Sequence, residues 1–275
     1  MPISAIRAMS TKLEIGYICV TLAYAAILDL GKVSVARFFV QQDPRISNPY
    51  EPSSVSTLCL GVLAVLLPAC LICIMRSYGQ LGSTPQEPLL IAFGLVHSTQ
   101  WAVVGTFKGL VGRLRPNFFA LCNYCGYRDA LKSGKFTDYM ACAPAGLPGD
   151  FEKCRDTMKS GRLSFPSGHS STAFAGLGFL GFMLAAAARR AGCPPLVQVL
   201  CTLPPLFAAS WVAATRVQES WHFESDIFAG STIGFSIMAF VFHTRVWPLM
   251  FADDETNRDL SPDVVESQLA VPDES

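Results

Sequence analysis

Six stretches of apolar residues, each close to the length that crosses a lipid bilayer, limit the folds open to this 275-residue chain. A helix needs about 20 mostly apolar residues to span the hydrocarbon core. The six runs cover approximately residues 15–30, 55–75, 89–107, 172–188, 195–214 and 227–242. With 51% hydrophobic and only 15% charged residues, the composition is also that of a membrane protein. The sequence therefore predicts an all-α fold, a bundle of six transmembrane helices.

One connection between the runs is much longer than the others. Residues 108–170 are mostly polar, and we expect this third loop to form a small cap outside the bilayer. An even number of spans places both termini on one side of the membrane. We assign residues 1–250 to the membrane domain. Residues 251–275 carry eight acidic residues and one arginine, and they are predicted to form a disordered tail.

Four of the ten cysteines share the long loop, and the other six lie in or beside apolar runs. Four loop cysteines could bind zinc or form two disulfides. Their spacing after the first Cys-x-x-Cys does not repeat as it does in a zinc ribbon. We therefore favour disulfides, provided that the loop faces an oxidising compartment, although the sequence does not determine the pairing. The four are Cys122, Cys125, Cys142 and Cys154.

The charged residues say less about the fold, the partners and the membrane orientation than the hydropathy does. The formal net charge is zero, so composition gives no reason to expect a nucleic acid partner. Lysine and arginine number seven on the side of the termini and fourteen on the other side, ten of them in the long loop. That loop lies at the edge of the length for which the positive-inside rule holds, so charge does not settle the orientation.

A polar turn, Pro166-Ser-Gly-His169, comes directly before the fourth apolar run. Free N–H groups and the helix dipole make a helix start a natural site for a phosphate. Pro166 would set the first helical φ, Ser167 offers a hydroxyl, and Gly168 allows close approach of a ligand. His169 could then donate a proton. The alternative is an ordinary helix start with an uninvolved histidine.

A second group of polar residues ends the third run, in the segment 108–116. The seven-residue separation of Lys108 and Arg115 is close to two helical turns, so both cations can lie on one helix face. Pro116 disfavours helix at the residue before it and marks the boundary. Two cations at a membrane boundary are also typical of side chains that snorkel toward lipid headgroups, which is the alternative interpretation.

A third group joins the fifth and sixth runs and contains Arg216, His222 and Asp226. If the sixth helix begins near His222, Asp226 follows one turn later and can hold the imidazole in one orientation. This arrangement is typical of an activated histidine nucleophile. A helix-start histidine paired by chance with a carboxylate is the alternative. With six spans, all three polar groups lie on the same side of the membrane.

These three groups resemble the signature of the type 2 phosphatidic acid phosphatase family, integral-membrane lipid phosphate phosphatases that share a site with vanadium haloperoxidases. The family pattern is Lys-x6-Arg-Pro, then Pro-Ser-Gly-His, then Ser-Arg-x5-His-x3-Asp. The chain matches these spacings except for Thr215, which replaces the usual Ser and keeps a hydroxyl. The segment 43–50 also looks like part of the first loop of eukaryotic lipid phosphatases.

The resemblance implies a role for each matching residue. His222 would attack phosphorus to give a phosphohistidine, Asp226 would orient it, and His169 would protonate the leaving alkoxide and then activate water. The phosphate-binding residues would be Lys108, Arg115, Ser167, Gly168 and Arg216. Three fixed cations and a helix start can balance the phosphoryl charge, so we expect no metal and no cofactor. Arg113 is a candidate for contact with a lipid headgroup.

The expected function is metal-independent hydrolysis of a lipid phosphate, phosphatidate above all, and also diacylglycerol pyrophosphate or lysophosphatidate. Phosphatases of isoprenyl pyrophosphates or sphingoid phosphates are alternatives within the enzymes, and an inactive scaffold or receptor is the alternative of another class. The resemblance places the site on the lumenal or extracellular side of an endomembrane or the plasma membrane, with both termini and the acidic tail in the cytosol. The partners expected are the lipid substrate and the bilayer, and the oligomeric state stays open.

Overall fold

The computed structural model describes residues 3–31, 34, 35, 37, 43–82, 84–122 and 160–251, and all regular structure among them is helical. Most of the expected cap, Cys125, Cys142, Cys154 and the acidic tail lie outside the described residues. Cys122 is buried at the end of a short helix. The division into a membrane domain and a tail therefore stays a prediction.

Six helices in the described residues are long and apolar enough to cross a membrane, which confirms the predicted fold class. The first, second and third spans are α1 (Ile3–Gly31), α2–η2–α3 (Thr57–Gly61, Val62–Leu66 and Leu67–Ser77) and α4 (Gln86–Val111). The others are α9 (Gly168–Arg190), α10 (Pro195–Gln218) and α11 (Glu224–Val241), which continues through η5 (Phe242–Val246) to Phe251. The short helices η1 (Pro44–Ile46) and α5 (Phe118–Cys122) lie in loops.

Five of the six helices are longer than the apolar runs that predicted them, and the second span has the same length as its run. The fourth run was expected from residue 172, yet α9 begins at Gly168, and α10 continues to Gln218 rather than ending near residue 214. Backbone hydrogen bonds carry a helix through polar residues wherever those side chains find partners. A count of apolar residues therefore underestimates a helix whose ends carry polar groups.

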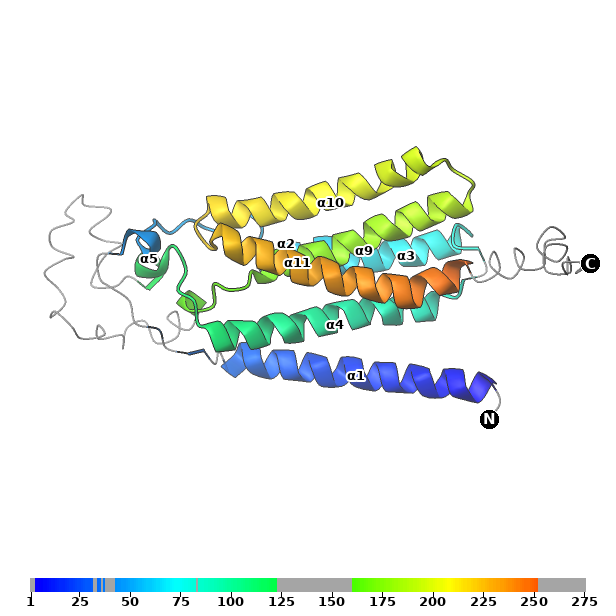
Figure 1. The fold of residues 1–275 in the computed structure, drawn as a ribbon, viewed down its shortest axis with the longest axis horizontal. Helices are drawn as coiled ribbons and strands as arrows, with labels where there is room; N and C mark the ends of the chain where they lie inside the picture. The colour runs from blue at the N-terminus through cyan, green and yellow to red at the C-terminus, as the bar shows by residue number, and fades with distance from the viewer. Residues whose placement is uncertain are drawn as a thin grey trace, which may run out of the picture.

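Helix α9 lies at the centre of the bundle, and α1 lies at its edge (Figure 1). In the most apolar 18-residue stretch of α9, 72% of the residues are buried, whereas the share in the corresponding stretch of α1 is 0%. Helix α9 packs against α10, α11, α4 and the second span, whereas α1 packs mainly against α4. Small residues let these backbones approach: a Cβ on Gly176 would lie 1.7 Å from the Ala64 carbonyl oxygen, so only glycine fits.

The second span contains a π-helical turn, η2, where it meets α9. Pro68 follows this turn and has no N–H to offer to the carbonyl of Ala64, four residues earlier. A widened turn relieves the clash between the proline ring and that carbonyl. The Ala64 oxygen instead points at the backbone of Gly176.

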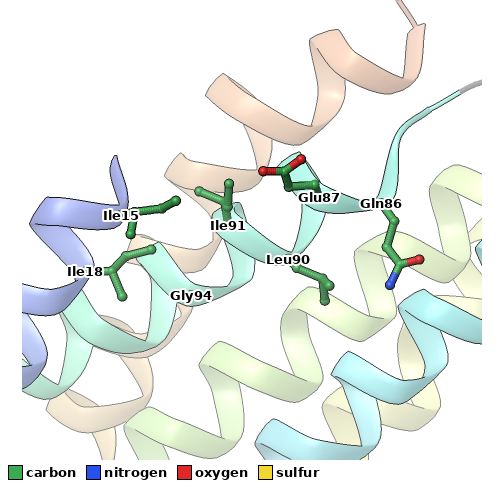
Figure 2. Close-up of a pocket in the computed structure, with 7 residues that line it drawn as sticks. All are labelled: Ile15, Ile18, Gln86, Glu87, Leu90, Ile91 and Gly94. Atoms are coloured by element: carbon green, nitrogen blue, oxygen red, sulfur yellow. The ribbon is translucent and has the colours of Figure 1, made fainter. Parts of the chain in front are cut away.

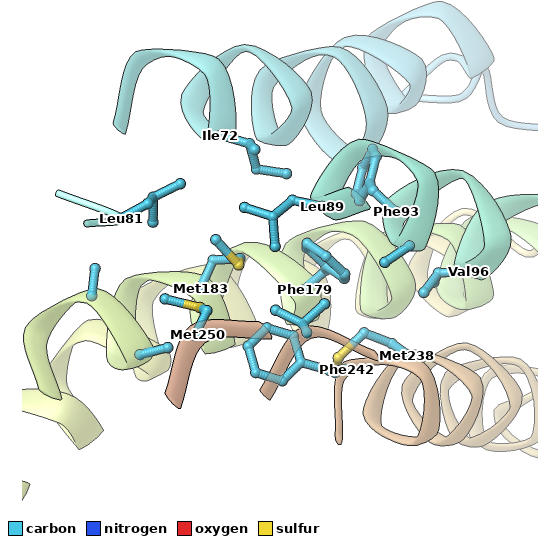
Figure 3. Packing of buried hydrophobic residues seen from close by; sticks show 14 of the residues in the cluster. Ile72, Leu81, Leu89, Phe93, Val96, Phe179, Met183, Met238, Phe242 and Met250 are labelled. Carbon is cyan, nitrogen blue, oxygen red and sulfur yellow. The ribbon is translucent and has the colours of Figure 1, made fainter. Parts of the chain in front are cut away.

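The main apolar core fills one end of the bundle (Figure 3). Phe179 and Met183 of α9 meet Phe93 of α4 and Phe242 of η5, with the Phe93 and Phe179 rings 5.1 Å apart. The start of α1 and the end of the sixth span lie at this end (Figure 1). The ends of α4 and α10 and the starts of α9 and α11 lie at the other end, as the predicted topology requires.

Candidate active site

The turn before α9 forms a helix cap, but not through the proline. Ser167 is the N-cap, with φ −70° and ψ 116°, and its hydroxyl oxygen accepts a hydrogen bond from the Ser170 N–H at 3.3 Å. The helix begins at Gly168, so Pro166 precedes the cap. The prediction that Pro166 occupies the first helical position was wrong by two residues, because the serine hydroxyl ends the non-helical segment.

Gly168 brings the backbone of this turn against a cation from another helix. The Lys108 Nζ lies 3.3 Å from the point that a Cβ on Gly168 would occupy, and Val104 of α4 lies 4.0 Å from it. A larger side chain would push the ammonium away from the helix start. The structure thus brings the first and second polar groups of the sequence together.

Arg115 does not share a helix face with Lys108, contrary to prediction. Helix α4 ends at Val111, and Gly112 takes a left-handed conformation with φ 56°. A Cβ there would lie 2.1 Å from the Val35 carbonyl oxygen, which only glycine avoids. The chain therefore turns over the end of the bundle, and Arg115 reaches the site from a loop.

The guanidinium of Arg115 is buried and fixed by carbonyl groups. Its Nε donates to the Ser160 carbonyl at 2.8 Å, and one Nη donates to the Trp221 carbonyl at 3.2 Å. Burial lowers the pKa of Arg115 to about 10, so the group is still a cation at neutral pH. Arg115 connects the first polar group to the third.

Arg216, at the end of α10, has three polar neighbours. Thr215 Oγ1 accepts from its Nε and Nη2 at 3.2 and 3.0 Å, and Ser53 Oγ accepts at 2.6 Å. The Glu219 carboxylate forms an ion pair with it at 2.7 Å. The threonine that departs from the family pattern thus still supplies its hydroxyl to Arg216. Sequence reasoning missed Glu219, whose position one helical turn after Arg216 was the available signal.

His222 and Asp226 lie close together, but not on one helix face as predicted. Helix α11 begins at Glu224, so His222 lies in the preceding turn. Its Nδ1 is 3.7 Å from the Asp226 Oδ2, which is longer than a hydrogen bond. Burial lowers the pKa of His222 to about 3, and the charges of Arg115 and Lys108 act in the same direction. The imidazole is therefore neutral at physiological pH.

The Asp226 carboxylate has closer partners than His222. Oδ1 contacts an Nη of Arg113 at 2.7 Å. Oδ2 accepts from the Ser164 hydroxyl at 2.6 Å and from the Phe223 N–H at 3.0 Å. Sequence reasoning missed Ser164, and it considered Arg113 only for contact with a headgroup.

The loop before the second span completes the site. His169 Nε2 lies 3.1 Å from the Val55 carbonyl oxygen, and the Ser54 N–H donates to Glu219 at 2.8 Å. In the same loop the Asn48 N–H donates to the Pro116 carbonyl at 3.0 Å. The resemblance identified only residues 43–50 of this loop, whereas the loop as a whole contacts all three polar groups through Asn48, Ser54 and Val55.

Close packing between α9 and α11 sets the distance between the last two polar groups. The Ser167 N–H donates to the Asp226 carbonyl at 2.9 Å. Cβ atoms on Gly230 and Gly234 would lie 2.3 and 2.1 Å from the carbonyl oxygens of Ser167 and Ser171. This Gly-x3-Gly pair brings α11 against the backbone of α9. Lys108, Arg115 and Arg216 all lie within electrostatic range of His169.

An apolar groove in the described part of the molecule lies away from these residues. It measures about 660 Å³, is almost entirely apolar and opens between α1 and α4 (Figure 2). Ile15, Ile18 and Gly94 line it, and Gln86 and Glu87 mark the end nearest the start of α4. Its place at the far end of the bundle and its apolar lining separate it from the three polar groups.

Comparison with known proteins places these observations in a family. The model of the PAP2 superfamily matches residues 89–249. The chain is 32% identical over 247 residues to the "Probable diacylglycerol pyrophosphate phosphatase 1" of Schizosaccharomyces pombe, covering 88% of this chain and 82% of that protein. It is 31% identical to "Lipid phosphate phosphatase 2" of Arabidopsis thaliana, covering 70% of this chain and 63% of that protein.

A third relative is the "Diacylglycerol pyrophosphate phosphatase 1" of Saccharomyces cerevisiae, 30% identical over 220 residues, with 77% of this chain and 71% of that protein covered. No solved structure matches the chain. The family model spans the third to sixth membrane helices and contains every residue of the three polar groups. The chain therefore belongs to the PAP2 superfamily, which confirms the resemblance inferred from its three polar motifs.

Proposed function

We propose that this multi-pass membrane protein is a metal-independent lipid phosphate phosphatase that acts through a phosphohistidine. The observation that carries the proposal is the buried pair of His222 and Asp226, within electrostatic range of Lys108 and Arg115 at one end of the bundle. Phosphatidate, diacylglycerol pyrophosphate and lysophosphatidate are the proposed substrates. The names of the relatives support this choice.

His222 is the proposed nucleophile because it is neutral and its Nδ1 faces a carboxylate. An N–H on Nδ1 directed at Asp226 leaves the lone pair on Nε2, which attacks phosphorus. A P–N bond forms as the P–O bond to the lipid alcohol breaks, and His169 gives its proton to the leaving alkoxide. Water then attacks phosphorus, His169 takes its proton, and the P–N bond breaks to release phosphate.

The cations around the site balance the charge that phosphoryl transfer concentrates on three equatorial oxygens. Lys108, Arg115 and Arg216 supply three positive charges, and the Gly168 N–H at the start of α9 adds a donor. Ser167 caps α9 and completes the proposed phosphate-binding set. Fixed charges of this kind stabilise a transition state without reorganisation, so the mechanism requires no metal.

Lipid substrates fit a site at the end of a membrane bundle, because acyl chains remain in hydrocarbon while the phosphate enters the polar pocket. An apolar groove of about 530 Å³ lies between α9, α10 and the second span. Leu177 and Val212 line it and also pack with Val55, whose carbonyl contacts His169. The site is proposed to face the lumen or the outside, with both termini in the cytosol.

Phosphate release from the purified protein tests the proposal. The panel contains phosphatidate, lysophosphatidate, diacylglycerol pyrophosphate, an isoprenyl pyrophosphate and a sphingoid phosphate, each with EDTA present. We expect turnover of the glycerolipids in EDTA and a loss of at least about 10³-fold in His222→Ala. Activity that disappears with EDTA, or that survives undiminished in His222→Ala, contradicts the mechanism. Preference for another lipid would correct the substrate, and inactivity on the whole panel would favour a scaffold.

A further inference from the structure

The carboxylate of Asp226 is held by groups other than His222. The side chain is fully buried, and its short contacts are to Arg113 at 2.7 Å, the Ser164 hydroxyl at 2.6 Å and the Phe223 N–H at 3.0 Å. The contact with His222 is the longest of the four at 3.7 Å. The direction in which Asp226 presents Oδ2 to the histidine therefore depends on these three neighbours.

Arg113 contributes to this arrangement through both its backbone and its side chain. Its carbonyl accepts the N–H of Ser164 at 3.0 Å, which places the Ser164 hydroxyl against Oδ2. Its guanidinium contacts Oδ1, donates to the Ser225 hydroxyl at 2.6 Å and lies 4.2 Å from the centre of the Phe223 ring. A planar group held on several sides has a fixed orientation. Arg113 thus joins the chain after α4 to the turn before α9 and to the start of α11.

We infer that Arg113 is a positioning residue for the phosphatase reaction, which orients the Asp226 carboxylate toward His222 and is not a ligand for a lipid headgroup. The inference rests on the proposed function. The Arg113 side chain is 32% exposed, yet its ion pair is with the fully buried carboxylate of Asp226. Removing it would leave Oδ1 of a buried carboxylate without its cation.

The pH dependence of turnover reports this role. His222 faces Asp226, Arg115 and Lys108, and Asp226 itself faces Arg113, Arg115, Lys108 and His222. Loss of the Arg113 charge leaves the Asp226 charge less compensated and removes a nearby cation. Both changes favour the imidazolium form of His222 and raise its pKa, so the acid limb of kcat/KM moves to higher pH.

The experiment compares Arg113→Met and Arg113→Lys in the full-length protein, with phosphatidate in mixed micelles over a range of pH. We expect kcat of Arg113→Met to fall on the order of 10²-fold with KM unchanged. The acid limb of the pH profile of kcat/KM for Arg113→Met should move to higher pH by roughly one unit. Arg113→Lys keeps the charge but not the planar fork, so it should retain the wild-type acid limb and recover part of kcat.

Arg245→Met is the matched control, because Arg245 is also an arginine paired with a carboxylate, that of Glu14, but lies in η5 at the opposite end of the bundle. Its kcat, KM and acid limb should equal those of the wild type. If Arg113→Met does not fold, Ser164→Ala replaces it, with kcat expected to fall at constant KM because it removes a second ligand of the same carboxylate.

A rise of KM in Arg113→Met at constant kcat, larger for substrates with more headgroup charge, would show headgroup binding and overturn the inference. Wild-type values of kcat and of the acid limb in Arg113→Met would also overturn it, as would wild-type kcat in Ser164→Ala. None of these outcomes touches the proposed function, which is tested separately by wild-type activity in EDTA and by the loss of activity in His222→Ala.

Discussion

The two ends of the bundle are built from the same helices but held together in different ways. At one end, α4, α9 and the sixth span contribute aromatic rings and methionines, and the contacts are apolar (Figure 3). At the other end, α9, α10 and α11 contribute buried polar groups such as Ser171, Arg216 and Asp226, and the contacts are hydrogen bonds and ion pairs. Within α9, ten residues separate His169 at the polar end from Phe179 in the apolar core.

We interpret this difference as a division of roles: the apolar end stabilises the fold, and the polar end carries the proposed reaction. Apolar packing tolerates small adjustments and depends on volume, whereas a buried polar group is costly unless every partner is in place. The polar end is therefore the more easily disturbed in function, and the apolar end contributes more of the stability. Substitutions at matched positions test this separation.

The largest effect on stability is expected at the apolar end. Phe179 is fully buried and contacts the rings of Phe93 and Phe242. Phe179→Ala leaves a cavity that should lower the free energy of unfolding by about 3–5 kcal/mol. Unfolding in detergent micelles measures this, and kcat of the folded fraction should stay unchanged. A stable variant, or one with reduced kcat, would show that the two ends are not independent.

The next effect concerns close packing between α9 and α11. A Cβ on Gly234 would lie 2.1 Å from the Ser171 carbonyl, so Gly234→Ala forces the helices apart and should cost about 1–3 kcal/mol. Because this contact is near the polar end, phosphatase activity should fall as well. Gly16→Ala in α1 is the control, since no atom lies within 4 Å and stability should not decrease. Equal behaviour of the two variants would show that helix spacing does not set the site.

The third effect is a dependence of stability on pH. The pKa of His222 falls from 6.5 to about 3 because burial disfavours the imidazolium. Between these two pKa values, the unfolded chain binds a proton that the folded protein does not bind. The free energy of unfolding is therefore highest above pH 6.5 and decreases as the pH falls toward 3. The slope approaches about 1.4 kcal/mol per pH unit. His222→Gln should reduce this slope in unfolding measurements from pH 7 to pH 5, and an unchanged slope would contradict the burial of a neutral imidazole.

The smallest effect concerns a hydrogen-bond network between α4 and α9. Gln100 accepts the Ser171 hydroxyl at 2.6 Å and donates to Thr172 at 3.2 Å. Gln100→Leu should cost about 1 kcal/mol, because buried polar contacts between membrane helices contribute little individually. A double-mutant cycle with Ser171→Ala measures the coupling. Strictly additive losses would show that the two side chains do not cooperate.

Hydropathy predicted six spans and their order because the hydrocarbon core demands a fixed length of apolar helix. Helical spacing was less reliable at the helix ends. It allowed Lys108 and Arg115 to share one helix face, although Gly112 ends α4 between them, and it assumed a sixth helix that begins near His222 rather than at Glu224. These ends depend on caps and on contacts with the rest of the chain, which periodicity does not describe.

The motif residues could be named from the sequence because phosphate chemistry demands particular side chains at helix ends. The residues that support them could not. Ser164 and Asp226 are 62 positions apart, Ser53 and Arg216 are 163 apart, and Ser54 and Glu219 are 165 apart. Nothing local distinguishes these serines from any other loop serine.

The sequence by itself determined the membrane class, the six helices, the family and the proposed reacting groups, because each follows from local composition or spacing. Only the tertiary structure decided which groups surround Asp226, that Glu219 pairs with Arg216, and that the loop before the second span contacts His169. The physical reason is that these contacts join distant segments. Their geometry is set by close backbone approach at glycines such as Gly176 and Gly230, which exists only once the helices have packed.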